Sequence, residues 1–260
     1  MALAAVIWDI DDTLVNTRSC HIRCQRLALR DLGVAAWHID AALRVWNELY
    51  WYFDRSDHVG ILLALAGELG LDNADEDLIR VVASRMSYPW DACLMPKPGV
   101  VGCLDHLANA GVPLGIVSNG RPELQRLKLE KTRLDRYFPP TAVAVATPGG
   151  ETAKPRPHAI LACCATLGVP PRSCLYVGDR RSDVVAANIA GVRPVLIPSG
   201  MFEFKEPTTV TLGLERPFRT FATARDFHRW IAHREPIGPT ATPPTATQTT
   251  ATQTTATNRP

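Results

Sequence analysis

The sequence predicts an α/β fold with a doubly wound, mainly parallel, Rossmann-like sheet and an inserted all-helical domain. Two observations lead to this prediction. Short apolar runs alternate with amphipathic, helix-like segments over most of the chain, and repeated β-then-α units need crossover connections that make the strands parallel. Residues 17–92 instead show helix-like spacing alone, without a convincing alternating strand.

The first predicted strand is the apolar run from Leu3 to Trp8, which leads straight into Asp9, Asp11 and Thr13. An uninterrupted apolar run of this kind is typical of a strand that is buried on both faces of a parallel sheet. Ligands bind at the carboxyl edge of such sheets, where the strands leave the core. We therefore expect chemistry directly after this strand.

Residues 17–92 form the predicted helical insertion. Gly33 and Gly70 stand where helices would end, because glycine readily adopts the left-handed conformation that closes a helix. The spacing predicts about four helices. The apolar residues that recur at helical intervals are Ile22, Leu27, Leu29, Leu32, Leu43, Trp46, Leu49, Ile61, Leu62, Leu65 and Leu69.

After Pro98 and Gly99 the alternation of strands and helices resumes. Most of the predicted helices connect successive strands, as a parallel sheet requires. Strands are predicted at residues 113–117, 142–146, 174–177 and 194–197. Helices are predicted at 100–110, from Pro122 onward, and at 158–167, 182–190 and 221–233.

The chain thus divides into three parts. Residues 1–16 and 93–235 form the predicted α/β core, residues 17–92 the helical domain, and residues 236–260 a tail rich in Thr, Ala, Pro and Gln. The tail contains no aromatic residue, and Ile237 is its only large aliphatic residue. Because it cannot bury enough apolar surface to offset the entropy of ordering, we expect it to be disordered.

The composition excludes several classes of protein. The 260 residues carry a net charge of +2, which does not suggest the clustered basic surface of a nucleic-acid or membrane binder. With 46% hydrophobic residues the chain can build a core, so it is neither wholly disordered nor fibrous. The sequence does not indicate an oligomeric state.

The cysteines and the apolar segments indicate a compartment. The seven cysteines include no C-x-x-C pair, so reduced thiols are a simpler interpretation than a zinc site or a disulfide framework. Asp9 interrupts the apolar N-terminal run before it could act as a signal segment, and no run of about 18 apolar residues occurs. We expect a soluble, cytoplasmic protein without a membrane or nucleic-acid partner.

The strongest chemical signal is the pair Asp9 and Asp11 directly after the first strand. Two carboxylates at this spacing can take different roles, one attacking a substrate and the other handling a proton. Aspartate and threonine are also favoured where strands end and helices begin. The pair alone therefore leaves both interpretations open.

Polar residues also follow the later strands. Ser118 and Asn119 come after the second apolar strand, Lys154 after the third, and Asp179 and Asp183 after the fourth. Each junction thus supplies a polar group at the same edge of the sheet. Taken singly, these residues have ordinary alternatives: a turn at Ser118, a solvated Lys154, and an Asp183 that stabilises the first turn of a helix.

This ordered set of four motifs resembles the haloacid dehalogenase-like (HAD) superfamily, over roughly residues 3 to 200. Neighbouring residues are similar as well: Pro98-Gly99 before a helix, Lys154-Pro155, and Ala190-Gly191 after the last motif. The helical insertion resembles the cap domain of small-molecule hydrolases in this superfamily. The resemblance implies a catalytic core with a cap over its site.

The resemblance also implies roles for the motif residues. Asp9 would be the nucleophile that forms an aspartyl-phosphate, and Asp11 the acid and base that protonates the leaving group and later activates water. Ser118 would donate its hydroxyl to a phosphate oxygen beside the backbone N–H of Asn119. Lys154 would neutralise the charge that grows in the transition state.

A phosphoryl group repels an attacking carboxylate, so the implied chemistry needs a cation. Mg²⁺ suits an oxygen-only shell, and its implied ligands are the carboxylates of Asp9 and Asp179 and the backbone carbonyl of Asp11. Asp183 would bind the metal through water or hold Lys154 in place, and the sequence leaves these two roles open.

The function that follows is a Mg²⁺-dependent phosphatase acting on a small phosphorylated metabolite. Asp11 and Asp179 favour phosphoryl transfer over 2-haloacid dehalogenation, in which no leaving oxygen needs a proton. A sugar-phosphate mutase remains an alternative, because water entry depends on closure of the cap. A non-catalytic binding module is disfavoured, since Asp9 and Asp179 are both present.

The cap is expected to set substrate specificity by closing over the site. Its candidates for binding anionic groups are Arg18, His21 and Arg23, for which a solvated surface position is the ordinary alternative. Its candidates for stacking on a base or sugar are Tyr50, Trp51 and Tyr52, for which packing between cap helices is the ordinary alternative.

Overall fold

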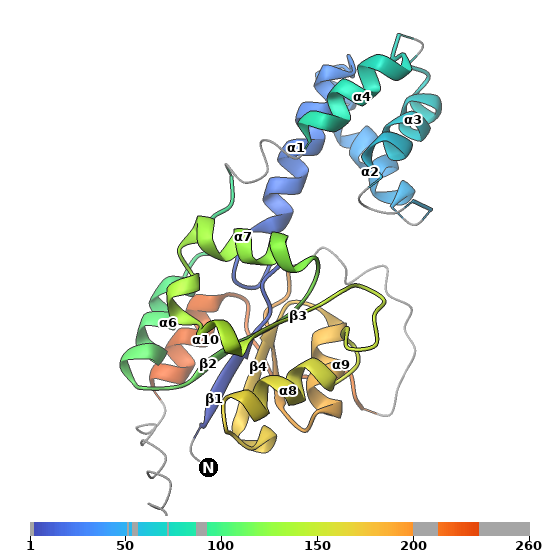
Figure 1. The fold of residues 1–260 in the computed structure, drawn as a ribbon. Coiled ribbons are helices and arrows are strands. Elements are labelled where there is room, and N and C mark those ends of the chain that lie inside the picture. The colour runs from blue at the N-terminus through green and yellow to red at the C-terminus, as the bar shows by residue number, and fades with distance from the viewer. Residues whose placement is uncertain are drawn as a thin grey trace, which may run out of the picture.

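The computed structural model describes residues 3–50, 52–53, 57–71, 73–86, 93–199 and 213–233, and Figure 1 shows their arrangement. The predicted disordered tail, residues 236–260, lies outside the described residues, as does Trp51.

The core contains a six-stranded sheet in the order β3-β2-β1-β4-β5-β6, and all of its strand pairs are parallel. The predicted doubly wound α/β fold is confirmed. The short edge strand β6 was not predicted, because its two residues are exposed and form no apolar run. The strands are β1 (Ala5–Trp8), β2 (Leu114–Asn119), β3 (Val143–Ala146), β4 (Cys174–Gly178), β5 (Arg193–Leu196) and β6 (Arg219–Thr220).

The central strand β1 is buried along its whole length and contributes to both faces of the sheet. Val6 and Trp8 belong to one hydrophobic cluster, whereas Ala5 and Ile7 belong to another, because successive side chains of a strand point in opposite directions. Trp8 packs edge-on against Phe227, with ring centroids 5.6 Å apart. This accounts for the unbroken apolar run in the sequence.

Helices cover both faces of the sheet (Figure 1). One face is covered by α6 (Val100–Asn109), α7 (Pro122–Thr132) and α10 (Ala224–Ala232). The other is covered by α8 (His158–Thr166) and α9 (Arg181–Ile189). None of the helices in the described ranges is long and apolar enough to cross a membrane.

The insertion contains four helices in its described part, α1 (Thr17–Asp31), α2 (Ile39–Leu49), α3 (His58–Leu69) and α4 (Glu76–Arg85). They pack around a hydrophobic cluster of their own, whose fully buried members include Leu29, Trp46, Ile61, Leu62, Leu65 and Ile79. Gly33 and Gly70 have φ values of 82° and 63°, the left-handed conformation expected where helices end.

The two connections between core and insertion are paired with each other. Val15 and Pro96 form an antiparallel bridge, and Lys97 N donates to Leu14 O at 2.8 Å. Asn16 completes the pairing twice, since its backbone N–H donates to Met95 O at 3.1 Å and its side-chain Oδ1 accepts from Met95 N at 2.7 Å. The outgoing and returning segments therefore form one short ribbon.

Candidate active site

Strand register brings the sequence motifs to one edge of the sheet. Trp8, the last residue of β1, is aligned with Ile116 in β2 and with Val177 in β4, so the residues that follow these three positions lie at the same edge of the sheet. Asp9 follows directly, and its backbone N–H donates to Val177 O at 2.9 Å. Ser118 lies two residues beyond Ile116, in the part of β2 that extends past the end of β1.

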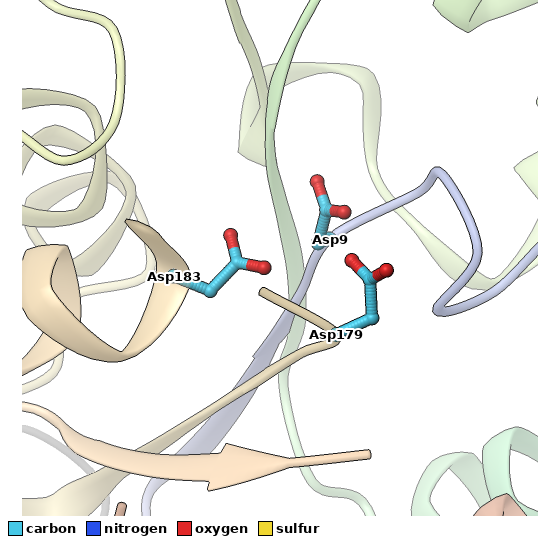
Figure 2. Close-up of side chains that lie close together, drawn as sticks. All are labelled: Asp9, Asp179 and Asp183. Carbon is cyan, nitrogen blue, oxygen red and sulfur yellow. The ribbon is translucent and has the colours of Figure 1, made fainter. Parts of the chain in front are cut away.

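Three acidic side chains meet at this edge. Oxygens of Asp9, Asp179 and Asp183 all lie within 4.8 Å of one another, and all three residues are buried. Figure 2 shows the three carboxylates converging on a common space from β1, from the end of β4 and from α9. Gly178 makes this approach possible, because a Cβ atom there would lie 2.4 Å from Asp183 Oδ2.

Lys154 forms ion pairs with two members of this acidic cluster. Its Nζ donates to Asp9 Oδ1 at 2.7 Å and lies 2.6 Å from Asp183 Oδ1, and its side chain is only 4% exposed. Tyr176 Oη is 2.8 Å from the same nitrogen and donates to Val117 O at 2.6 Å. Burial disfavours the charged form of Lys154, but Asp183 and Asp9 outweigh this effect and raise its pKa.

Burial of the acidic cluster disfavours the charged forms of its carboxyl groups. It raises the pKa of Asp9 to about 6, although the charge of Lys154 acts in the opposite direction. Burial, together with the negative charges of Asp183 and Asp9, also raises the pKa of Asp179 well above its ordinary value. Asp179 Oδ2 accepts from Ser199 Oγ at 2.5 Å. Asp179 Oδ1 is buried and accepts no hydrogen bond from the described residues, with Arg180 Nε 3.9 Å away.

These features fit a divalent cation with oxygen ligands. Three buried carboxylates repel one another, and an unbonded carboxylate oxygen in the interior costs free energy unless a cation or donor satisfies it. Mg²⁺ is such a cation, and Asp9, Asp179 and Asp183 are the side chains that would hold it.

Asp11 is not part of this acidic group, and its carboxylate turns toward α7 and α1 instead. Oδ1 accepts from Thr17 Oγ1 at 2.6 Å and from Lys128 Nζ at 2.5 Å, and Oδ2 accepts from Gln125 Nε2 at 2.8 Å. Burial opposes ionisation of Asp11, but the charge of Lys128 and these hydrogen bonds together lower its pKa.

Contacts from α7 and from the backbone of Lys154 hold Ser118 and Asn119, the last two residues of β2, in place. Ser118 is buried, and its Oγ lies 3.3 Å from Gln125 Nε2. The side chain of Asn119 makes a reciprocal pair with the backbone of Lys154, donating to its carbonyl at 3.0 Å and accepting from its N–H at 2.9 Å. Sequence reasoning considered only the backbone of Asn119, so this use of its side chain is new.

The cap candidates are distributed unevenly. Arg18 Nη1 donates to Ser199 O at 2.9 Å, next to the acidic cluster, whereas His21 and Arg23 are exposed. Tyr50 packs against the hydrophobic cluster of the insertion and its Oη accepts from Gln25 at 3.2 Å, in line with the packing alternative. Tyr52 is 83% exposed.

Sequence reasoning missed Gln125 and Lys128. Both lie on the buried face of α7 with Leu129 and Thr132, at positions where an apolar side chain would be expected. The sequence does carry a signal for them, because two long polar residues occupy the core-facing side of a helix that follows a strand with a polar end. Such a pattern indicates buried polar contacts near the site. It was missed because α7 was interpreted only as a polar helix.

The comparison with protein families decides the class of enzyme. The sequence model of the haloacid dehalogenase-like hydrolases matches residues 3–191. The chain belongs to this family. The resemblance drawn from the four motifs is confirmed, and the protein is an enzyme of the HAD-like hydrolase type.

Several phosphatases are similar to this HAD-like hydrolase. Glyceraldehyde 3-phosphate phosphatase of Methanopyrus kandleri is 29% identical over 214 residues, covering 79% of this chain and 88% of the relative. Phosphoglycolate phosphatase of Pseudomonas syringae pv. tomato is 33% identical over 207 residues, covering 75% of this chain and 69% of the relative.

Solved structures show the same fold. A HAD family hydrolase from Deinococcus radiodurans, with bound phosphate and sodium, aligns with a TM-score of 0.63 at 22% identity and covers 89% of this chain and 96% of its own. A HAD-superfamily hydrolase from Geobacter sulfurreducens aligns with a TM-score of 0.62 at 20% identity, with coverages of 88% and 96%.

Proposed function

We propose that this HAD-like hydrolase is a Mg²⁺-dependent phosphatase that hydrolyses a small phosphorylated metabolite through an aspartyl-phosphate. The observation that carries the proposal is the buried group of Asp9, Lys154, Asp179 and Asp183 at one edge of the sheet. The names of the relatives, which are phosphatases of phosphoglycolate and glyceraldehyde 3-phosphate, support the same reaction.

In the first half of the reaction, one carboxylate oxygen of Asp9 attacks phosphorus and the bond from phosphorus to the leaving oxygen breaks. Asp11, whose pKa is lowered in this structure by Lys128 and its hydrogen bonds, must take up a proton before this step. It gives that proton to the leaving oxygen, which departs as an alcohol, so that Asp9 carries the phosphoryl group. Asp9 is fixed for this attack by Lys154, which binds its Oδ1 at 2.7 Å. The other oxygen is left for the nucleophilic role.

In the second half, a water molecule attacks phosphorus and gives its proton to Asp11. The bond between phosphorus and Asp9 breaks, phosphate leaves, and both carboxyl groups return to their starting states. Ser118 donates to a phosphoryl oxygen, and Lys154 offsets the negative charge of the transition state. Bound Mg²⁺ supplies further positive charge against the repulsion between the phosphoryl group and Asp9.

The helical insertion acts as the cap of this enzyme. Residues 1–16 and 93–235 form the catalytic core and residues 17–92 the cap, joined by the paired segments around Val15 and Pro96. A cap that closes over the site excludes bulk water and admits only small substrates. The substrate is therefore a short phosphomonoester of the kind named in the relatives rather than a phosphoprotein.

The test is a panel of phosphorylated metabolites assayed for phosphate release with and without Mg²⁺, for the wild type and for Asp9→Asn. We expect release from at least one small phosphomonoester, dependent on Mg²⁺ and abolished in Asp9→Asn, with the exposed Asp135→Asn as a matched control that keeps wild-type turnover. Comparable turnover in Asp9→Asn would remove Asp9 from its role. Halide release from a 2-haloacid without metal would favour a dehalogenase, and intramolecular phosphoryl transfer without phosphate release would favour a mutase.

A further inference from the structure

Two side chains of α7 hold the carboxylate of Asp11. Lys128 Nζ contacts Oδ1 at 2.5 Å and Gln125 Nε2 contacts Oδ2 at 2.8 Å, so each oxygen has a donor from the same helix. Lys128 and Gln125 are 5% and 1% exposed. Burying an ammonium and an amide is unfavourable unless both are paired, so their placement at Asp11 is specific.

Gln125 also ties Asp11 to the loop that is proposed to bind phosphate. Its Nε2 lies 3.3 Å from Ser118 Oγ and 3.0 Å from Asn119 O, in addition to its contact with Asp11. Gly120 makes room for this amide, because a Cβ atom at that position would lie 2.5 Å from Nε2. The amide therefore fixes the distance between Asp11 and Ser118.

The remaining contact of Asp11 comes from the cap. Thr17 Oγ1 donates to Oδ1 from the first residue of α1, whereas Gln125 and Lys128 belong to the core. The core donors do not depend on where the cap lies, so they define the position of the carboxylate relative to Asp9.

We propose that Gln125 and Lys128 are positioning residues, which set the orientation of Asp11 for proton transfer to the leaving oxygen. This inference rests on the proposed phosphatase function. Neither side chain touches the reacting atoms; Lys128 acts through Asp11, and Gln125 acts through both Asp11 and Ser118. Without either donor, the carboxylate loses its fixed position near Ser118, and the step that needs a proton slows.

The experiment compares two classes of leaving group. An alkoxide needs a proton as it leaves, whereas 4-nitrophenolate is stable without one, so only the alkyl ester depends on Asp11 as an acid. The alkyl probe is 2-phosphoglycolate or glyceraldehyde 3-phosphate, whichever the wild type hydrolyses, and the aryl probe is 4-nitrophenyl phosphate. The quantity measured is kcat/KM, which includes only the steps up to cleavage of the first P–O bond.

In Lys128→Met and in Gln125→Leu, we expect kcat/KM for the alkyl ester to fall roughly tenfold or more relative to the aryl ester, as part of the 10²–10⁴-fold contribution typical of general acid catalysis. The loss appears in kcat rather than in KM. A merely structural defect lowers the active fraction and reduces both substrates by the same factor. Lys131→Met, on the exposed side of α7, is the matched control and keeps the wild-type ratio.

Asp11→Asn provides the reference for complete loss of the acid. In the Asp11→Asn background, Lys128→Met should not change the ratio of kcat/KM for the alkyl and aryl esters any further, because the effects of two substitutions that act through one group are not additive. An additive effect, or equal losses on both substrates in both single variants, would overturn the positioning role. Failure of the wild type to hydrolyse either ester would instead reject the proposed function itself.

Discussion

Lys154 and Asp9 form an enclosed ion pair, with Nζ 2.7 Å from Oδ1 and side chains that are 4% and 6% exposed. The pair joins the loop after β3 to the end of β1, across 145 positions of the chain. Asp183 shares the same ammonium group at 2.6 Å. One cation thus holds together two of the three carboxylates at the centre of the site.

Replacement of this cation should destabilise the fold as well as the site. Lys154→Met leaves Asp9 and Asp183 buried without their partner, and breaking a buried pair costs about 3–5 kcal/mol. We expect a loss of that size in the free energy of unfolding, measured by urea denaturation in metal-free buffer. The exposed Lys131→Met should unfold at the wild-type midpoint. An unchanged midpoint for Lys154→Met would show that the ion pair does not stabilise the protein.

Mg²⁺ should stabilise the protein through the acidic cluster. A ligand that binds only the folded state adds about 2.7 kcal/mol at a concentration 100 times its Kd, so the Tm should rise as Mg²⁺ is added. Asp179→Asn replaces one carboxylate oxygen by an NH2 group and removes the negative charge beside the oxygen that lacks a hydrogen bond among the described residues, so it should abolish this rise. Thermal melts with and without EDTA measure the effect independently of activity. Equal rises in the wild type and in Asp179→Asn would argue against the site.

Ser199 should tune the affinity for the metal. Its hydroxyl donates to Asp179 Oδ2 at 2.5 Å, and loss of a hydrogen bond to a metal ligand typically weakens metal binding about 10–100-fold. Titration of the Tm shift with Mg²⁺ should show this change in Ser199→Ala. Ser84→Ala is a suitable control, since the hydroxyl of this exposed residue donates to Val81 O within α4. Identical titrations for wild type and Ser199→Ala would mean that the hydroxyl does not support the ligand.

Gly178 should be intolerant of a methyl group. The added Cβ of Gly178→Ala would lie 2.4 Å from Asp183 Oδ2 and 2.5 Å from its Cγ, so Asp183 must move away from Lys154. We expect turnover to fall sharply and the free energy of unfolding to drop by about 1–3 kcal/mol, as in other overpacked sites. Gly67→Ala has nothing within 4 Å and lies inside α3, so it should stabilise the protein by roughly 0.5–1 kcal/mol. Wild-type kinetics in Gly178→Ala would show that Asp183 has room to shift.

The parts of the fold with strong apolar patterns could be predicted from the sequence. β1 is a continuous apolar run because both of its faces are buried, and the helices of the insertion show the spacing of one buried stripe. β6 has neither signal, since it adds two exposed residues at the edge of the sheet. Its position depends on a tertiary contact, the pairing of Val195 with Arg219.

Some features of the site could likewise be predicted from the sequence, and others could not. The positions of Asp9, Asp179 and Lys154 follow from their place after strands, because parallel strands end at a common edge. The orientation of Asp11 could not be predicted in this way. Its side chain is turned by Thr17, Gln125 and Lys128, which come from two helices that no local pattern connects with the first strand.

The bridge between Val15 and Pro96 gives the bundle of α1 to α4 a single pivot instead of two independent tethers. Thr17 lies two positions beyond that pivot, and its hydroxyl binds Asp11. A rotation of the bundle about this pivot would change the distance between Thr17 Oγ1 and Asp11 Oδ1. The donors from α7 would stay in place. The hydroxyl of Thr17 thus links the carboxylate of Asp11 to the inserted bundle, whereas Gln125 and Lys128 link it to the core.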